Sequence, residues 1–408
     1  MGNDGDGVAE APDFRPLYLP LTLPGERVQP GPLQRLGDAW VADSTVLDPS
    51  PDRMVPSCRH FGPCGGCTVQ HMSDPAYAAW KPTLLADALA RLGYEATLPP
   101  LLRTLPGARR RMDLAIRREN GAVRIGLHMR RSASVVDMQE CPVLHPALFA
   151  VVQALRPVLR SMTGLKREGS AIVNLIDGGA DLLLRTDVPL TAYDRVRLAG
   201  LAAQCGMPRI SWALGDRGLA EPACNLHPAT VAFSGQVTPV PPGAFLQASL
   251  EGEAAIQDAV MAALPAMKAR AMVVELFAGV GSLTHRIAAA ARVQAYEGDA
   301  DAVLAIKAAG NPRVIATRRD LARQPLAAVD LKPAATIVLD PPWGGAREQM
   351  AALGASGLPI VYVSCNPAAL FRDGRVLTGM GYRVASAVPI DQFLWSARTE
   401  AVVGFRKP

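Results

Sequence analysis

The C-terminal part of the chain alternates short apolar runs with segments of helical periodicity, and this alternation restricts the fold more than any other feature. From about residue 271 onward, runs such as "AMVVELFA", "AATIVLD" and "PIVYVSC" are each followed by a stretch in which apolar residues recur every three to four positions. Strands that are apolar at nearly every position belong to parallel sheets covered by helices on both faces. Residues 241–408 are therefore predicted to form an α/β domain.

The rest of the chain has a different organisation. Residues 1–52 read as short strands separated by glycine and proline, which predicts a small β-barrel. Residues 53–240 mix strands and helices, among them a predicted helix over 74–93, so we expect a central α+β domain. The division is thus 1–52, 53–240 and 241–408.

Composition excludes several classes of protein. No apolar run is long enough to span a membrane, and the first residues lack the pattern of a signal peptide. Seven cysteines, three of them within ten positions, do not resemble a disulfide framework. We therefore expect a cytoplasmic protein without a membrane partner, and a monomer.

The net charge of +5 permits a nucleic-acid partner without requiring one. Seven arginines lie close together in sequence, on neighbouring predicted strands, and we predict that they contact phosphates, with a solvated strand face as the alternative. They are Arg109, Arg110, Arg111, Arg117, Arg118, Arg130 and Arg131.

The stretch "VVELFAGVGSLT" predicts a buried strand, a glycine loop and a helix. Gly279 and Gly281 would let the backbone pass close to a ligand at the carboxyl end of the sheet. A dinucleotide-binding loop would have glycine at position 284, where this chain has Thr284. The NAD(P) interpretation is weakened accordingly.

Acidic residues follow the next three predicted strands. Glu297, with Asp299 as second choice, is placed to bind a ribose diol, although a helix cap is the structural alternative for both. Asp320 would accept from an adenine amino group, and Asp340 would lie at the mouth of the pocket. Acids at successive strand ends favour a cationic nucleoside, so S-adenosylmethionine fits better than a dinucleotide.

Cys365 ends another apolar strand, at the same predicted edge of the sheet. A thiolate near a helix N-terminus has a lowered pKa and is a good nucleophile, whereas a small buried core thiol is the alternative. With a methyl donor, a thiolate suggests attack on C6 of a pyrimidine, which activates C5 for methylation. A base must then remove the C5 proton, and Glu400 is the candidate.

These motifs together resemble one family. The stretches "SPDRMVPSC", "CGGC", "ECPVLHP", "LFAGVGSLT", "LDPP" and "VYVSCNPAALFRD" make most of the chain similar to the RNA uracil-5-methyltransferases, in their iron–sulfur branch that acts on 23S rRNA. The resemblance implies a class I, Rossmann-like, S-adenosylmethionine-dependent methyltransferase domain. It also implies a TRAM-like RNA-binding barrel in residues 1–52, with its usual first strand missing.

The resemblance assigns roles to individual residues. Cys365 would be the nucleophile and Glu400 the base that takes the C5 proton. The S-adenosylmethionine site would be lined by Gln247, Phe277, Gly279, Gly281, Ser282, Glu297, Asp320 and Asp340. A [4Fe–4S] cluster would be held by Cys58, Cys64, Cys67 and Cys141. Four thiolates suit zinc as well as a cluster, and spacing alone does not decide between them.

Two departures from the family pattern affect the expected substrate. Trp343 follows "DPP", where the family often has Arg or Ala, and the run before Glu400 has Leu394, Ser396 and Arg398 in place of Pro, Thr and His. The leading hypothesis is methylation of a uridine in 23S rRNA. A tRNA uridine-C5 methyltransferase, a cytosine-C5 enzyme, a redox enzyme and a non-catalytic RNA-binding protein are the alternatives.

Overall fold

A computed structural model describes residues 1–2, 4–268 and 270–408. Its largest sheet has the strand order β18-β17-β16-β19-β20-β22-β21-β7, in which only β22 runs antiparallel to its neighbours. The strands are β7 (Leu102–Arg103), β16 (Met272–Leu276), β17 (Arg292–Glu297), β18 (Val314–Arg318), β19 (Ala334–Leu339), β20 (Ile360–Ser364), β21 (Arg383–Asp391) and β22 (Glu400–Arg406). The predicted Rossmann-like α/β fold is confirmed.

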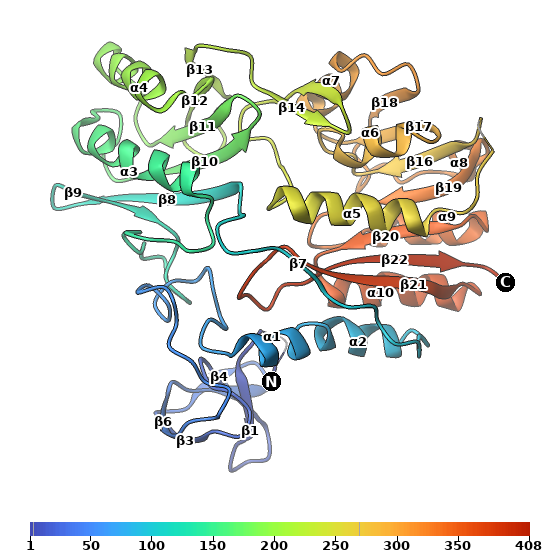
Figure 1. Cartoon of the computed structure of the whole chain (residues 1–408), viewed down its shortest axis with the longest axis horizontal. Helices are drawn as coiled ribbons and strands as arrows, with labels where there is room; N and C mark the ends of the chain where they lie inside the picture. The colour runs from blue at the N-terminus through green and yellow to red at the C-terminus, as the bar shows by residue number, and fades with distance from the viewer. Residues whose placement is uncertain (3, 269) are drawn as a thin grey trace.

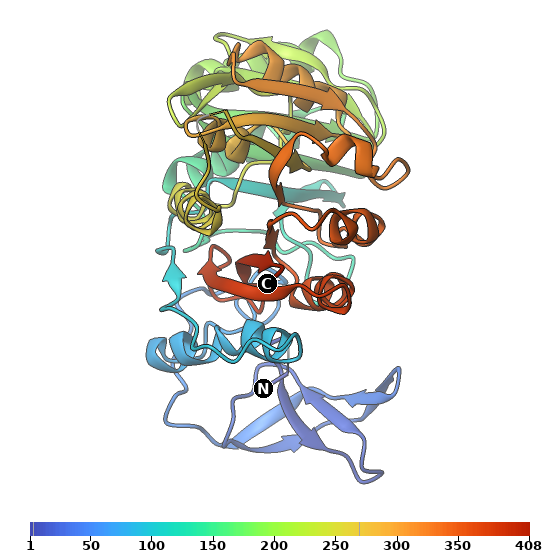
Figure 2. The same cartoon turned by 90° about the vertical axis from the view of Figure 1, so that its right-hand side faces the viewer.

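Helices cover both faces of this sheet, and Figure 2 shows α5 on one side with α10 on the other. One apolar core joins the sheet to α5, α6 and α7, and a second joins it to α2, α9 and α10. The helices are α1 (Asp74–Trp80), α2 (Thr83–Ala90), α5 (Leu250–Ala263), α6 (Ser282–Ala288), α7 (Ala300–Ala308), α8 (Ala328–Leu331), α9 (Met350–Ser356) and α10 (Pro367–Gly379), with the short 3-10 turn η1 (Arg347–Gln349).

An early part of the chain completes this C-terminal sheet. Strand β7 pairs in parallel with β21 and forms the edge of the sheet, and α2 buries Leu85 and Leu89 in the core that it shares with α10. Residues 74–103 therefore pack with the C-terminal sheet, although the sequence groups them with the central domain. The division into three domains stays a prediction.

The middle of the chain forms a six-stranded sheet with α3 (Pro146–Ser161) and α4 (Ala192–Cys205) packed in one apolar core (Figure 1). Its order is β13-β12-β11-β10-β8-β9, and only β11 and β12 pair in parallel. The strands are β8 (Arg111–Glu119), β9 (Ala122–Gly126), β10 (Glu168–Ile176), β11 (Gly179–Thr186), β12 (Arg209–Leu214) and β13 (Glu221–Asn225); the separate hairpin is β14 (Thr230–Phe233) and β15 (Gln236–Pro239).

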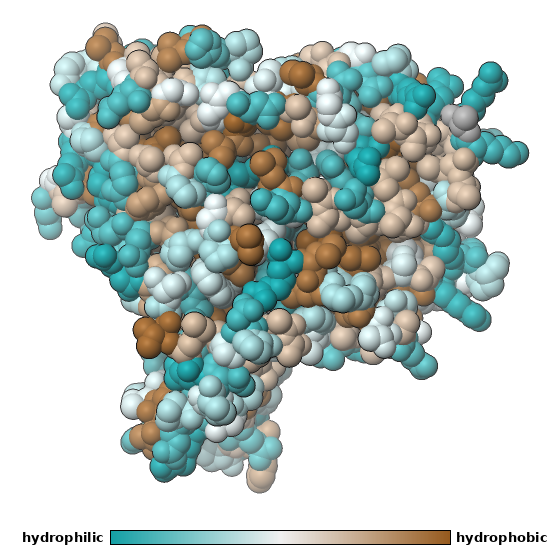
Figure 3. Space-filling view, in the orientation of Figure 1, coloured by the Kyte–Doolittle hydropathy of each residue, from teal (hydrophilic) through white to brown (hydrophobic). Residues whose placement is uncertain are grey.

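The N-terminal strands form a narrow extension below the body of the molecule (Figure 3). Within the described residues they make a four-stranded and a two-stranded sheet, not joined by strand pairing, so the closed barrel stays a prediction. The strands are β1 (Gly7–Glu10), β2 (Pro16–Leu19), β3 (Arg27–Pro30), β4 (Gln34–Leu36), β5 (Ala39–Val41) and β6 (Ser44–Asp48). Across the described chain, no helix combines the length and apolarity needed to cross a membrane.

Candidate functional site

The glycine loop connects β16 to α6 at the carboxyl edge of the sheet, where β16 lies between its two parallel neighbours, β17 and β19. Phe277, Gly279 and Gly281 all have positive φ, at 61°, 56° and 99°. A side chain other than hydrogen at Gly281 would approach the His285 ring to 3.0 Å, whereas the space beside Gly279 is open. The loop thus leaves room at the point where open α/β sheets bind ligands.

Glu297 holds this loop from the end of β17. Its Oε2 accepts from the Gly279 backbone N–H at 2.8 Å, and its Oε1 accepts from the Asp299 N–H at 2.9 Å. Asp299 itself caps α7, since its carboxylate accepts from the N–H groups of Asp301 and Ala302. Glu297 is therefore placed beside the open part of the loop, and Asp299 has the structural role that was its alternative.

Asp320 lies next to Glu297 along the same edge, because the Arg319 N–H donates to the Glu297 carbonyl at 2.7 Å. Its Oδ1 accepts from the N–H groups of Ala322 and Arg323 at 3.1 and 3.2 Å, so one carboxylate oxygen shapes a turn. The residue is exposed.

Helix α5 supplies contacts to Ser282 that the sequence reasoning missed. The Gln257 amide donates to the Ser282 hydroxyl and carbonyl at 3.2 and 3.0 Å. One turn earlier, Glu253 is buried, and burial raises its pKa, while the Ser282 hydroxyl and the Arg110 guanidinium oppose that rise. The sequence offered one hint of this contact: Glu253 and Gln257 are four positions apart, which places both on one face of a helix.

Cys365, Glu400 and Asp340 come together at the same edge. Strands β20 and β22 are neighbours, and Ser364 pairs with Ala401, which sets Cys365 beside Glu400. The pKa of the Cys365 thiol is raised to about 12, mainly by burial and also by the charges of Glu400 and Asp340, while Arg398 acts in the opposite direction. The predicted lowering of this pKa is wrong, because burial and two carboxylates outweigh the helix N-terminus.

A chain of hydrogen bonds joins the two carboxylates. The Gln247 amide donates to Asp340 at 3.1 Å, and the Gln392 amide donates both to the Gln247 oxygen at 2.8 Å and to Glu400 at 2.9 Å. The Ala248 N–H donates to the amide oxygen of Gln392 at 3.0 Å. This bond fixes which end of the Gln392 amide carries the nitrogen, and thereby the orientation of the Gln247 amide as well. The sequence predicted a role for Gln247 but not for Gln392. The only hint in the sequence is that Gln392 is a polar residue eight positions before Glu400.

Both carboxylates in this chain titrate at higher pH than usual. Burial is the main cause of the raised pKa of Asp340, and the hydrogen bond from Gln247 opposes it. Burial also raises the pKa of Glu400, and the negative charge of Asp340 adds to the effect. A carboxyl with a raised pKa is suited to exchange protons near neutral pH.

The structure gathers the four cysteines that the family resemblance proposes as ligands. Burial raises the pKa of Cys67 to about 12, with added contributions from the charges of Cys141, Cys64 and Cys58. The Gly66 N–H points to the Cys64 sulfur at 3.5 Å. Nevertheless, in the described part of the chain, no three Cys, His, Asp or Glu side chains are arranged closely enough to hold a metal ion. The donor types fit an iron–sulfur cluster or zinc, but the thiols are not closed around one point.

The cysteine segment also contacts the loop that leads to Glu400. The N–H groups of Thr68 and Val69, just after Cys67, donate to the Trp395 carbonyl at 2.8 and 3.1 Å. The cysteine segment and the loop before Glu400 are therefore in direct backbone contact.

The arginines of the central sheet have divided roles. Arg110 is 3% exposed and pairs with Glu253 at 2.6 Å, so the prediction that it contacts phosphate is wrong. Arg118 donates to the carbonyls of Arg160 and Met162 at the end of α3, both at 3.1 Å, and thus caps that helix.

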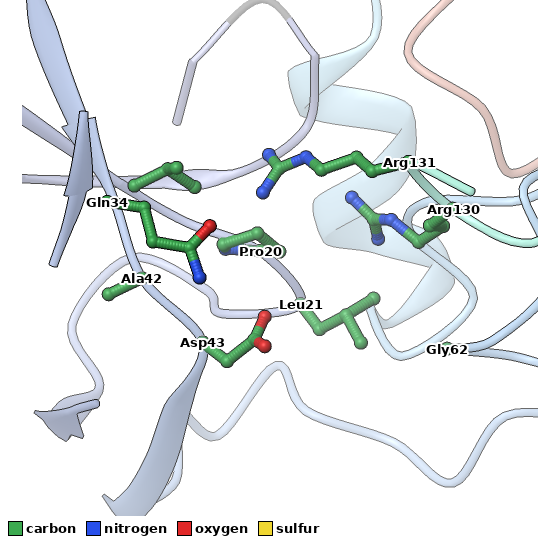
Figure 4. A pocket seen from close by; sticks show the side chains of 9 residues that line it. Pro20, Leu21, Gln34, Ala42, Asp43, Gly62, Arg130 and Arg131 are labelled. Atoms are coloured by element: carbon green, nitrogen blue, oxygen red, sulfur yellow. The ribbon is translucent and has the colours of Figure 1, made fainter. Parts of the chain in front are cut away.

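Arg130 and Arg131 lie at the junction with the N-terminal strands. Both contact Asp6, and they line a pocket of about 240 Å³ opposite Gln34 and Asp43 (Figure 4). Arg131 is exposed, whereas the Arg130 side chain is only 19% exposed, and the predicted phosphate contact stays a prediction for both.

Comparison with known proteins places the chain among RNA methyltransferases along its whole length. It is 37% identical to an uncharacterized RNA methyltransferase of Rhizobium meliloti, with all of this chain and 98% of the relative covered. It is 32% identical to the 23S rRNA (uracil(1939)-C(5))-methyltransferase RlmD of Halomonas elongata, with all of this chain and 88% of the relative covered. No protein-family model matches the chain.

Among solved structures, the fold matches the tRNA (uracil-54, C5)-methyltransferase of Pyrococcus abyssi in complex with S-adenosyl-L-homocysteine. The TM-score is 0.76, with 99% of this chain and 98% of that chain covered, at 19% identity. The whole-length relatives and the sheet that brings Cys365 and Glu400 together lead to one conclusion: the chain belongs to the RNA uracil-5-methyltransferase family.

Proposed function

We propose that this protein methylates C5 of a uridine in 23S rRNA, using S-adenosylmethionine. The observation that carries the proposal is the convergence of Cys365, Asp340 and Glu400 at the sheet edge that also bears the open glycine loop. The similarity to RlmD along the whole chain favours rRNA over tRNA as the substrate class. We further propose a cytoplasmic monomer whose partner is RNA.

The cofactor fits the residues at the loop. The space beside Gly279 is open, and the carboxylates of Glu297 and Asp320 lie along the adjoining strand ends. Phe277 and Ser282 flank the loop at either end. S-adenosylmethionine bound there would supply an electrophilic methyl group, and the acids would suit its positive charge.

Cys365 would act first, after losing its proton. Its thiol is neutral at rest because its pKa is raised, so the proton must leave as the substrate binds; Asp340 would accept it, since Glu400 must stay ionised to act as the base in the last step. The sulfur then bonds to C6 of the uracil, which leaves C5 electron-rich and able to take the methyl group.

Glu400 would complete the reaction. Once C5 carries both a methyl group and a proton, the Glu400 carboxylate removes that proton, the C5–C6 double bond re-forms and the C6–sulfur bond breaks. Gln392 holds Glu400 in place, and Gln247 reaches Asp340 where both can contact the base.

The first experiment is mass spectrometry of nucleosides from 23S rRNA and tRNA, prepared separately from cells with and without the gene. We expect loss of 5-methyluridine from 23S rRNA. Loss from tRNA instead would overturn the substrate class, and loss from neither pool would overturn the enzymatic proposal.

The mechanism is tested with purified protein. Cys365→Ala should not form a covalent adduct with RNA containing 5-fluorouridine, while Glu400→Gln should accumulate an adduct with unmodified RNA. Cys205→Ala, which changes a thiol in the core of the central sheet, serves as the control. Methylation by the Cys365→Ala variant would contradict the mechanism.

We also propose that residues 1–52 form a TRAM-like RNA-binding module.

A third proposal concerns the cysteines: Cys58, Cys64, Cys67 and Cys141 would hold a [4Fe–4S] cluster. Support for the cluster comes from the fold bringing Cys141, which is 74 positions from the nearest other cysteine of the set, within range of charge interaction with Cys67. Protein purified without oxygen should contain about four irons, and Cys141→Ser should lose iron while Cys224→Ser keeps it. One zinc in place of iron would refute the assignment.

A further inference from the structure

Trp343 is an exposed aromatic side chain at the mouth of the proposed active site. Its exposed fraction is 63%, and the other four tryptophans are all buried or half-buried. It lies three residues after Asp340, in the short loop that follows β19. An exposed indole at this place has no role in the core of the protein.

The backbone around Trp343 is held firmly. The Asn366 amide, directly after Cys365, donates to the Trp343 carbonyl at 2.9 Å, and the Arg372 guanidinium donates to the Gly344 carbonyl at 2.8 Å. The Gly345 N–H closes the turn onto the Pro342 carbonyl at 2.7 Å.

Buried groups of α10 support the same turn from below. The Asp373 carboxylate, 1% exposed, accepts from the Ala346 N–H at 2.7 Å and from the Tyr362 hydroxyl at 2.8 Å. Gly345 has a φ of 80°, and a β-carbon there would lie 2.5 Å from both Arg372 and Asp373, so only glycine fits. The fold thus builds a rigid support whose outermost group is the indole.

We propose that Trp343 is a stacking platform for an unpaired nucleobase that flanks the target uridine; this rests on the proposed function. Every base has a flat π-face, and single-stranded RNA is commonly held by stacking on aromatic side chains. Because the loop is already rigid, stacking loses little conformational entropy on binding. Asn366, which hydrogen-bonds to the Trp343 carbonyl, directly follows Cys365, so the platform lies close to the residue that would attack the target base.

The proposal is tested by substitution at Trp343. Stacking on one aromatic residue contributes enough that Trp343→Ala should raise the KM for RNA about tenfold. Its kcat at saturating RNA and its affinity for S-adenosylmethionine should stay within about twofold of wild type, as expected for a lost ground-state contact. Trp343→Phe should restore most of the affinity and Trp343→Leu should not, since leucine is apolar but has no π-face.

Two further measurements separate stacking from a general loss of structure. Tryptophan fluorescence of the wild type should be quenched on binding RNA, and Trp343→Phe should lack most of that quenching. RNA with an abasic site next to the target uridine should bind the wild type about tenfold more weakly but bind Trp343→Ala no more weakly than intact RNA. Val329→Ala, at an equally exposed residue on α8, is the control.

The outcomes distinguish this inference from the proposed function. If the wild type methylates uridine but the Trp343 variants bind RNA as it does, the platform is refuted while the function stands. If the wild type methylates no RNA, the proposed function fails first. Unchanged RNA binding with loss of a protein partner would assign the indole to a protein contact and overturn the inference.

Discussion

A buried lysine fixes the loop that precedes Glu400, and replacing it should destabilise the protein strongly. Lys81 is fully buried, with its Nζ 2.9 Å from Asp391, which is itself fully buried. The ammonium also donates to the carbonyls of Ser396 and Phe393 at 2.7 and 3.2 Å, and to the Tyr77 hydroxyl at 3.1 Å. Lys81, which lies just before α2, thus binds both ends of the turn at Phe393–Ser396 that leads to the proposed base Glu400.

Lys81→Met keeps the length of the side chain but removes its charge and donors. Removing one partner of a buried ion pair costs about 3–5 kcal/mol, because the other charge stays buried. The Tyr77 hydroxyl and the Phe393 N–H still reach Asp391, so we expect the lower end, about 3 kcal/mol, in the free energy of unfolding.

The assay is guanidinium denaturation followed by circular dichroism, with hydrogen exchange of residues 392–399 as a local readout. The control Lys307→Met, at an exposed residue of α7, should change the free energy of unfolding by no more than about 0.5 kcal/mol. Lys81→Met combined with Asp391→Leu should cost less than the sum of the two single changes. A loss under about 1 kcal/mol for Lys81→Met alone would refute the reasoning.

Three further predictions concern the site itself. The raised pKa of Glu400 means that its carboxylate form increases as pH rises, so release of the RNA adduct should accelerate with pH. Asp340→Asn removes a negative charge that raises this pKa, and should shift the pH profile of adduct release to lower pH. Single-turnover measurements of adduct release against pH test both statements. Gln392→Met removes the donor to Glu400 and should slow adduct release, visible as more trapped protein on denaturing gels, while RNA affinity stays the same. Gly281→Ala forces a φ of 99° on alanine beside His285, and should cost about 1–3 kcal/mol of stability and weaken S-adenosylmethionine binding in calorimetry.

The sequence predicted the parts of the site that follow from local pattern. Apolar strands ending in glycine, acid or cysteine implied one edge of a parallel sheet, because every parallel strand delivers its carboxyl end to the same side. Glu297 and Asp340 therefore lie at the predicted edge, and Cys365 lies beside Glu400.

The parts that could not be predicted depend on contacts between distant segments. Gln392 matters because it meets Gln247, which is 145 positions away, and no local pattern encodes that meeting. The sequence around Arg110 suggests a surface arginine, but in the fold Arg110 is buried in an ion pair with Glu253 of α5. The pKa of Cys365 was predicted in the wrong direction because burial depends on the whole fold, whereas the helix N-terminus is visible in the local sequence.

The pairing of β7 with β21 has a consequence for synthesis on the ribosome. Helix α2 and β7 emerge early, but the sheet that buries Leu85 and Leu89 is finished only when β21 and β22 have been made. At about 5–20 residues per second, the apolar face of α2 waits for roughly 15–60 seconds. The nascent chain therefore carries an exposed hydrophobic helix through most of its translation, and this helix is where a chaperone would be needed.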